Sequence, residues 1–117
     1  MIQVREVFRV KFGRAREAVA LAREGIAIEE ANGGAPTRLL TDLTGDYYQL
    51  VMESEYESLA AFEAALQQAM QAPEFREWYP KFAALIDGGR REIYRIVSQP
   101  ASQRVDASLV GEKVVAA

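Results

Sequence analysis

Apolar and polar residues alternate at the start of the chain, and the pattern then changes to a helical period. Residues 2–12, IQVREVFRVKF, hold most of their apolar side chains in one phase, as a strand with one apolar face does. Over residues 14–31 the apolar positions recur every three or four residues, and Asn32-Gly33-Gly34 supplies a C-terminal stop. The opening of the chain therefore predicts a strand followed by a helix.

The middle of the chain predicts a hairpin. Apolar-rich segments at residues 37–44 and 47–53 are separated by Gly45-Asp46, and two residues of this type suit a tight turn between antiparallel strands. Ser54-Glu55-Tyr56-Glu57 has the Ser-x-x-Glu form of a capping box. We therefore expect the third strand to pass directly into a second helix.

Two prolines predict that this second helical region is broken. Pro73 suits the first turn of a new segment, because its missing N–H would have no intrahelical partner there. Pro80 lies inside the next apolar stripe and is expected to divide it into two short pieces. Asp87-Gly88-Gly89 closes the region, and residues 90–98, RREIYRIVS, predict the last strand.

The order β-α-β-β-α-β is that of the ferredoxin-like unit. We expect an α+β domain over residues 1–98 with a four-stranded antiparallel sheet, and an extension over residues 99–117. The helices cover one face of such a sheet, and a second copy of the sheet is the usual cover for the other. The sequence therefore predicts a homodimer formed sheet to sheet. The extension, with apolar Val105, Leu109 and Val110, is expected to pack on the partner or on its own domain.

Composition and charge exclude several classes of function. The 117 residues hold 14 Lys and Arg against 17 Asp and Glu, so the chain has no basic excess with which to bind nucleic acid. Cysteine and histidine are both missing, which removes disulfides, thiolate chemistry, histidine-ligated haem and the Ser-His-Asp triad. We expect no cofactor, no metal and no membrane partner, and a cytoplasmic location, because the charged opening residues lack a secretory signal pattern.

Strand periodicity assigns five candidate ligand-binding residues to the sheet face away from the helices. Guanidinium groups bind carboxylates bidentately, and amide and phenol groups can orient the rest of a ligand. We predict a cavity between the two sheets of the dimer that holds a small organic or anionic ligand. The alternative is that these residues form interface salt bridges and hold nothing. The five residues are Arg38, Tyr47, Gln49, Arg91 and Arg95.

Glu6 is the one carboxylate in the apolar phase of the first strand. Burial would raise its pKa and make it a candidate acid or base, whereas pairing with an arginine or a small bulge would make it structural. An aromatic cluster at helical spacing, Phe75, Trp78, Tyr79 and Phe82, is expected to form core and not a cofactor site.

Four segments together resemble a known family: VREVFRVKFG, EEANGGAP, TDLTGDYYQLVMESEYESLAAFEAAL and APEFREWYPKFAALIDGGRREIYRIV. They are similar, over about residues 1–98, to the dimeric α/β-barrel superfamily and nearest to its NIPSNAP-type branch. The resemblance implies a ferredoxin-like homodimer, and members include cofactor-free monooxygenases and haem enzymes. Haem-dependent relatives use a histidine that this chain lacks. Asn32 ends a helix and Trp78 is expected in the core, so the catalytic positions of the monooxygenases do not match.

The predicted fold and composition are consistent with three alternative functions. A binding protein would hold a small organic ligand in the dimer cavity. A cofactor-independent monooxygenase would act there on a phenolic or polyketide-like substrate. An interaction protein would fill the same interface with its own side chains.

Overall fold

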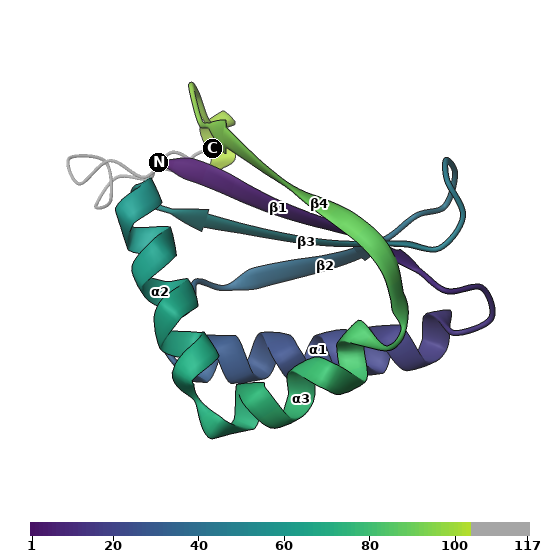
Figure 1. Ribbon diagram of the computed structural model, residues 1–117. Coiled ribbons are helices and arrows are strands. Elements are labelled where there is room, and N and C mark those ends of the chain that lie inside the picture. The colour runs from purple at the N-terminus through teal and green to yellow at the C-terminus, as the bar shows by residue number, and fades with distance from the viewer. Residues whose placement is uncertain (104–117) are drawn as a thin grey trace.

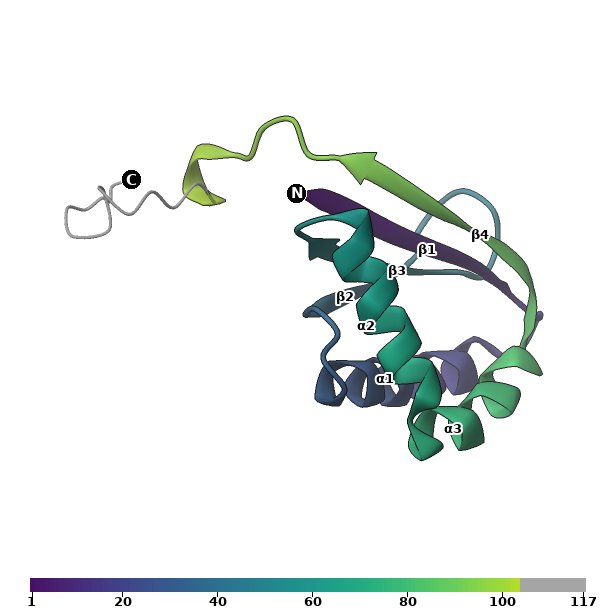
Figure 2. The same cartoon turned by 60° about the vertical axis from the view of Figure 1, so that its left-hand side comes forward.

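A computed structural model describes residues 1–103, in which one antiparallel sheet carries all the long helices on a single side (Figures 1 and 2). The sheet order is β2-β3-β1-β4, and every neighbouring pair of strands is antiparallel. This arrangement confirms the α+β ferredoxin-like prediction. The predicted contacts of Val105, Leu109 and Val110 lie outside the described residues. The elements are β1 (Ile2–Val10), α1 (Ala15–Ala31), β2 (Thr37–Thr41), β3 (Gln49–Tyr56), α2 (Leu59–Gln71), α3 (Pro73–Ala83), β4 (Ile86–Arg95) and the short 3-10 helix η1 (Ala101–Gln103).

Cross-strand register defines two faces of the sheet, because residues directly opposite each other on paired strands point the same way. Val4, Phe8 and Val10 of β1 point toward the helices and, with their partners on β3 and β4, form what we call the inner face. Arg5 and Val7 point away from the helices and belong to the outer face. Within residues 1–103, no helix is both long enough and apolar enough to cross a membrane.

Helices α1 and α3 make close contact through Gly25 and Trp78. The indole Nε1 of Trp78 donates a hydrogen bond of 2.6 Å to the backbone carbonyl of Leu21. A Cβ atom on Gly25 would lie 2.6 Å from Cε2 of that indole and closer still to Cζ2, so no larger residue fits. This contact explains a glycine in the middle of α1, where it otherwise weakens a helix.

Strand β4 starts earlier than the sequence pattern indicated, at Ile86 instead of Arg90. Arg9 pairs with Gly88 and Val10 pairs with Ile86, so Asp87 is an extra residue in a bulge. Gly89 lies within the strand, where a Cβ atom would meet the carbonyl oxygen of Val7. Gly88 and Gly89, which were predicted to close the helical region, instead lie in a curved strand and let it approach β1 (Figure 1).

The hairpin between β2 and β3 is longer than the tight turn predicted at Gly45-Asp46. Asp42 holds the base of a loop over residues 42–48, because its Oδ1 accepts a 2.9 Å hydrogen bond from the backbone N–H of Gln49. Gly45 has φ 110°, which a type II′ turn would also require, but Tyr48 has φ 61°, a left-handed position that lies outside a two-residue turn at Gly45-Asp46.

The helix boundaries also differ from the prediction. Ser58, not Ser54, caps α2 by accepting a 3.1 Å hydrogen bond from the N–H of Ala61. The start of a new helix at Pro73 is confirmed, because the extended backbone of Ala72 (ψ 133°) separates α2 from α3. The expectation that Pro80 divides the next segment was wrong, because α3 runs through it.

Candidate functional site

Two of the predicted ligand-binding residues, Arg38 and Gln49, lie on the outer face as expected. Arg38 Nη2 donates a 2.6 Å hydrogen bond to Glu53, which also lies 3.6 Å from Nη1 of Arg5. Farther along the face, Glu92 stands 2.6 Å from Nε of Arg90. Arg5, Arg38 and Arg90 of the outer face are thus paired with carboxylates, the arrangement that the salt-bridge alternative describes.

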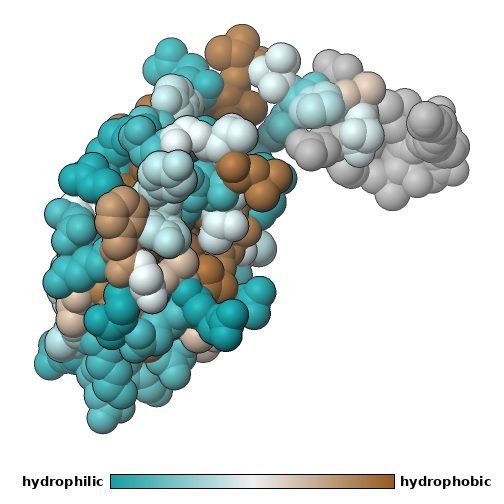
Figure 3. Space-filling model, turned by 90° about the vertical axis from the view of Figure 1, so that its right-hand side faces the viewer, coloured by the Kyte–Doolittle hydropathy of each residue, from teal (hydrophilic) through white to brown (hydrophobic). Residues whose placement is uncertain are grey.

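Tyr47 lies in the β2–β3 loop and not on the sheet face to which the pattern assigned it. Its side chain is 76% exposed, and its ring stands edge-on to Phe12 with the centroids 6.3 Å apart. The assignment was wrong because β3 begins two residues later, at Gln49. Figure 3 shows the end of the molecule that carries the β1–α1 and β2–β3 loops, where hydrophobic residues lie among hydrophilic ones.

The face prediction for Arg91 and Arg95 was also wrong. Arg91 stands opposite Glu6, and Arg95 stands opposite Ile2, so both point to the inner face. Strand β4 is an edge strand in which both phases mix arginine with apolar residues. Alternation on such a strand does not identify the buried phase.

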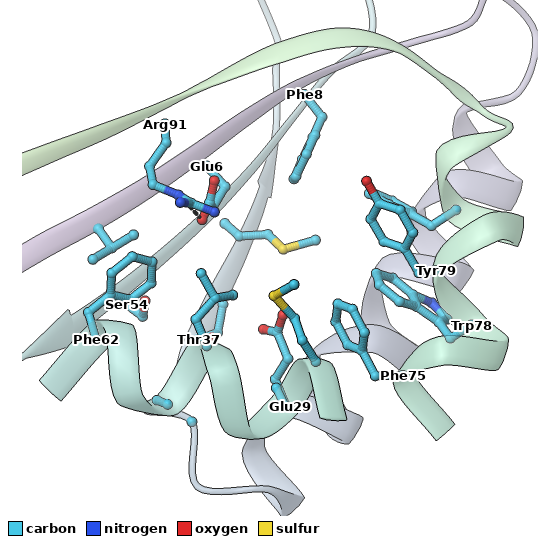
Figure 4. Close-up of a pocket in the computed structure, with 18 of the residues that line it drawn as sticks. Glu6, Phe8, Glu29, Thr37, Ser54, Phe62, Phe75, Trp78, Tyr79 and Arg91 are labelled. Atoms are coloured by element: carbon cyan, nitrogen blue, oxygen red, sulfur yellow. Dashed lines mark hydrogen bonds and ion pairs between the residues drawn. The ribbon is translucent and has the colours of Figure 1, made fainter. Parts of the chain in front are cut away.

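Between the inner face and the helices lies an open cavity of about 670 Å³ (Figure 4). The sheet contributes Glu6 and Arg91, α1 contributes Glu29, and α2 and α3 contribute mostly apolar and aromatic side chains. Among residues 1–103 no three potential metal-ligating side chains come together. The aromatic residues in the lining are Phe8, Tyr56, Phe62, Phe75, Trp78, Tyr79 and Phe82.

Glu6 is paired, in agreement with the structural alternative that the sequence left open. Its Oε2 accepts a 2.7 Å hydrogen bond from Nε of Arg91. The guanidinium carbon of Arg91 also lies 5.1 Å from the ring centroid of Phe62, within the range of a cation–π contact. These contacts hold the pair on the inner face of the sheet, where both residues line the cavity.

Glu29 is the functional candidate that sequence reasoning missed. Its side chain points into the cavity from α1 (Figure 4). Burial, and secondarily the negative charges of Glu6 and Glu30, raise its pKa from 4.5 to about 7, while Arg91 opposes the shift. A signal existed in the sequence, since Glu29 continues the buried stripe formed by Ala18, Ala22 and Gly25 at spacings of four, three and four.

The aromatic cluster forms core only in part. Phe75, Trp78 and Phe82 are buried, and Trp78 and Phe82 stack with centroids 5.0 Å apart, which confirms the prediction for these three. Tyr79 is 54% exposed and lines the cavity beside Phe75. The cluster thus supplies both a buried core and the wall of the cavity.

Comparison with known proteins supports the assignment of the fold. A family model described as NIPSNAP matches residues 4–100. A NIPSNAP family protein from Agrobacterium tumefaciens has a TM-score of 0.75 at 22% identity, covering 80% of this chain and 90% of that chain. A NIPSNAP-like domain protein from Burkholderia xenovorans has a TM-score of 0.76 at 24% identity, covering 85% and 89%.

A further structural likeness is to SnoaB, a cofactor-independent oxygenase from Streptomyces nogalater. The TM-score is 0.67 at 17% identity, and the match covers 86% of this chain and 96% of that chain. No curated protein sequence matches this chain significantly. At such identities the structural likenesses establish the fold and not the activity.

Proposed function

The chain belongs to the NIPSNAP family, and from that premise we propose that it binds a small organic molecule in the cavity between the inner face and helices α2 and α3. The observation that carries the proposal is the cavity itself. Its volume of about 670 Å³ lies within the range of roughly 300–1,000 Å³ typical of organic-ligand sites. Such sites combine apolar walls with a few polar groups, here Glu6, Glu29 and Arg91.

Replacing Ala65 by tryptophan is expected to weaken binding at least tenfold. Ala65 lines the cavity from α2, so an indole at this position would occupy the space that a ligand needs. Ala64 is exposed on the same helix and does not line the cavity, which makes Ala64→Trp the matched control. The measurement is isothermal titration calorimetry with tryptophol, an indole that carries a neutral hydroxyethyl arm. Equal affinity in the two variants would contradict the proposal and favour a purely structural interaction protein.

A second candidate function is that of a cofactor-independent monooxygenase acting on a phenolic or polyketide-like substrate. The specific support is a carboxyl group, Glu29, whose pKa of about 7 suits it to accept a phenolic proton at neutral pH. Similarity in fold to a cofactor-independent oxygenase is consistent with this candidate. Oxygen uptake with a hydroxyanthrone, lost in Ala65→Trp and retained in Ala64→Trp, would favour catalysis. Binding of the hydroxyanthrone without oxygen uptake would support only the binding function.

We further propose that two copies pair through the outer face. Among residues 1–103 no helix covers this face, and Leu40 and Tyr94 remain partly exposed on it, at 37% and 51%. Ion pairs between arginines and carboxylates interleaved with apolar groups are typical of protein interfaces.

Static light scattering is expected to give twice the chain mass of 13.0 kDa. Glu53→Arg should shift the mass toward the monomer, because it places a third positive charge between Arg5 and Arg38. Leu39→Val, a change on the inner face of the same sheet, serves as the control. A mass of one chain for the unaltered protein at micromolar concentration would refute the pairing.

A further inference from the structure

The charges that face the cavity indicate what kind of molecule fits it. Among residues 1–103, three carboxylates line it, from Glu6, Glu29 and Asp87, against one cationic side chain, Arg91. Arg91 is already bonded to Glu6 at 2.7 Å. Helices α2 and α3 contribute no charged residue to the lining. The described part of the chain therefore gives the cavity an excess of negative charge and offers no free guanidinium to an anion.

Aromatic side chains of α3 form one wall of the same cavity. Phe75 and Tyr79 are nearly parallel, with an interplanar angle of 18° and centroids 5.9 Å apart, and Trp78 lies beside them (Figure 4). The faces of such rings attract organic cations, and the attraction is stronger where water is excluded. A carboxylate together with aromatic faces is therefore a suitable environment for an ammonium group.

We infer that the cavity selects an organic amine, with an ammonium group carried on an apolar or aromatic body, and that Glu29 binds the ammonium group. The inference rests on the proposed binding function and specifies its ligand class. Glu6 is less suited to this role, because Arg91 already neutralises it. Glu29 has no such partner among the residues described, and burial favours its interaction with a cation that enters the same space.

The titration of Glu29 gives the inference a second, independent readout. Its carboxyl has a pKa of about 7 and is affected by the charges of Glu6 on β1, Arg91 on β4 and Glu30 on α1. An ammonium ion binds the ionised form better, so binding is expected to release a proton. For an amine that stays protonated, affinity is then expected to rise about tenfold between pH 6 and pH 8.

Calorimetry with three indoles that share a ring and differ in the polar end tests the inference. The probes are tryptamine, with an ammonium group, tryptophol, with a hydroxyl group, and indoleacetate, with a carboxylate. We expect tryptamine to bind at least tenfold more tightly than tryptophol, and indoleacetate to bind least tightly. Glu29→Gln is expected to abolish both the preference for tryptamine and its pH dependence, while it changes tryptophol affinity by less than about threefold.

The control is Glu24→Gln, an exposed carboxyl on the same helix that does not line the cavity. It is expected to leave all three affinities and the pH dependence unchanged. Indoleacetate or tryptophol binding as tightly as tryptamine would overturn the inference and leave the proposed function standing. A tryptamine preference that persists in Glu29→Gln would overturn the role of Glu29. Failure of all three probes to bind would overturn the proposed function together with the inference.

Discussion

Gly25→Ala is expected to destabilise the fold by about 3 kcal/mol, although alanine is the better helix former. The added methyl group would overlap the indole of Trp78, which is held by its hydrogen bond to the Leu21 carbonyl and by stacking on Phe82. The ring cannot move away without losing the hydrogen bond or the stacking contact, because the surrounding core is closely packed. Urea denaturation followed by far-UV circular dichroism measures the change in the free energy of unfolding.

A double-mutant cycle separates this clash from any other effect of the substitution. In a Trp78→Leu background, which is itself less stable, Gly25→Ala is expected to be neutral or stabilising. Ala27→Gly, at an exposed position of the same helix, is expected to lose only about 1 kcal/mol and gives the scale of helix propensity alone. A Gly25→Ala variant as stable as the original protein would show that the two helices do not meet as described.

Glu29→Gln is expected to stabilise the protein at pH 8 and to have less effect below pH 4.5. The pKa of Glu29 rises from 4.5 to about 7 on folding, so between these values the native state binds the extra proton. The free energy of unfolding contributed by this group is therefore highest below pH 4.5 and falls until about pH 7, by about 3 kcal/mol in total. Glutamine does not ionise and avoids this loss.

Urea denaturation of both proteins at intervals from pH 4 to pH 8 measures this effect. The quantity of interest is the difference between the two curves, because other carboxyl groups contribute equally to both. Glu24 is exposed on the same helix, so the free energy of unfolding of Glu24→Gln is expected to change with pH as that of the original protein does. If the free energy of unfolding of Glu29→Gln also followed that of the original protein at every pH, the carboxyl of Glu29 would not be desolvated in the native state.

The sequence predicted the order of the elements because alternation and helical spacing are local properties of the chain. It did not predict which phase of β4 faces the helices. Arg91 and Ile93 share a phase with Arg95, while Arg90 and Glu92 alternate with them, and neither phase is uniformly apolar. The face is decided by the bulge at Asp87 and the pairing of Arg91 with Glu6, which are contacts between distant segments.

The cavity of the structure lies on the opposite side of the sheet from the predicted dimer cavity, for a related reason. Cavities form where helices fail to cover a sheet completely, and this depends on how α2 and α3 diverge after Ala72. Pro73 marks the break between the two helices, but no short segment of sequence encodes the direction in which they diverge. Glu29 was detectable in principle, because the stripe of small residues along α1 ends in a carboxylate, but two adjacent acidic residues at a helix end usually face solvent.

Trp78 is the only tryptophan in the chain, and it joins two parts of the molecule that have been described separately. One edge of its indole fits against Gly25, and the residue also lines the cavity that Glu29 lines. Fluorescence emission from this single residue therefore originates where the helices meet and where a ligand would enter. Separation of α1 from α3 exposes the ring to water and shifts its emission to longer wavelength, whereas an occupant of the cavity changes its intensity while the ring stays buried. The unmodified protein thus carries its own optical probe, which distinguishes unfolding from occupancy without any added label.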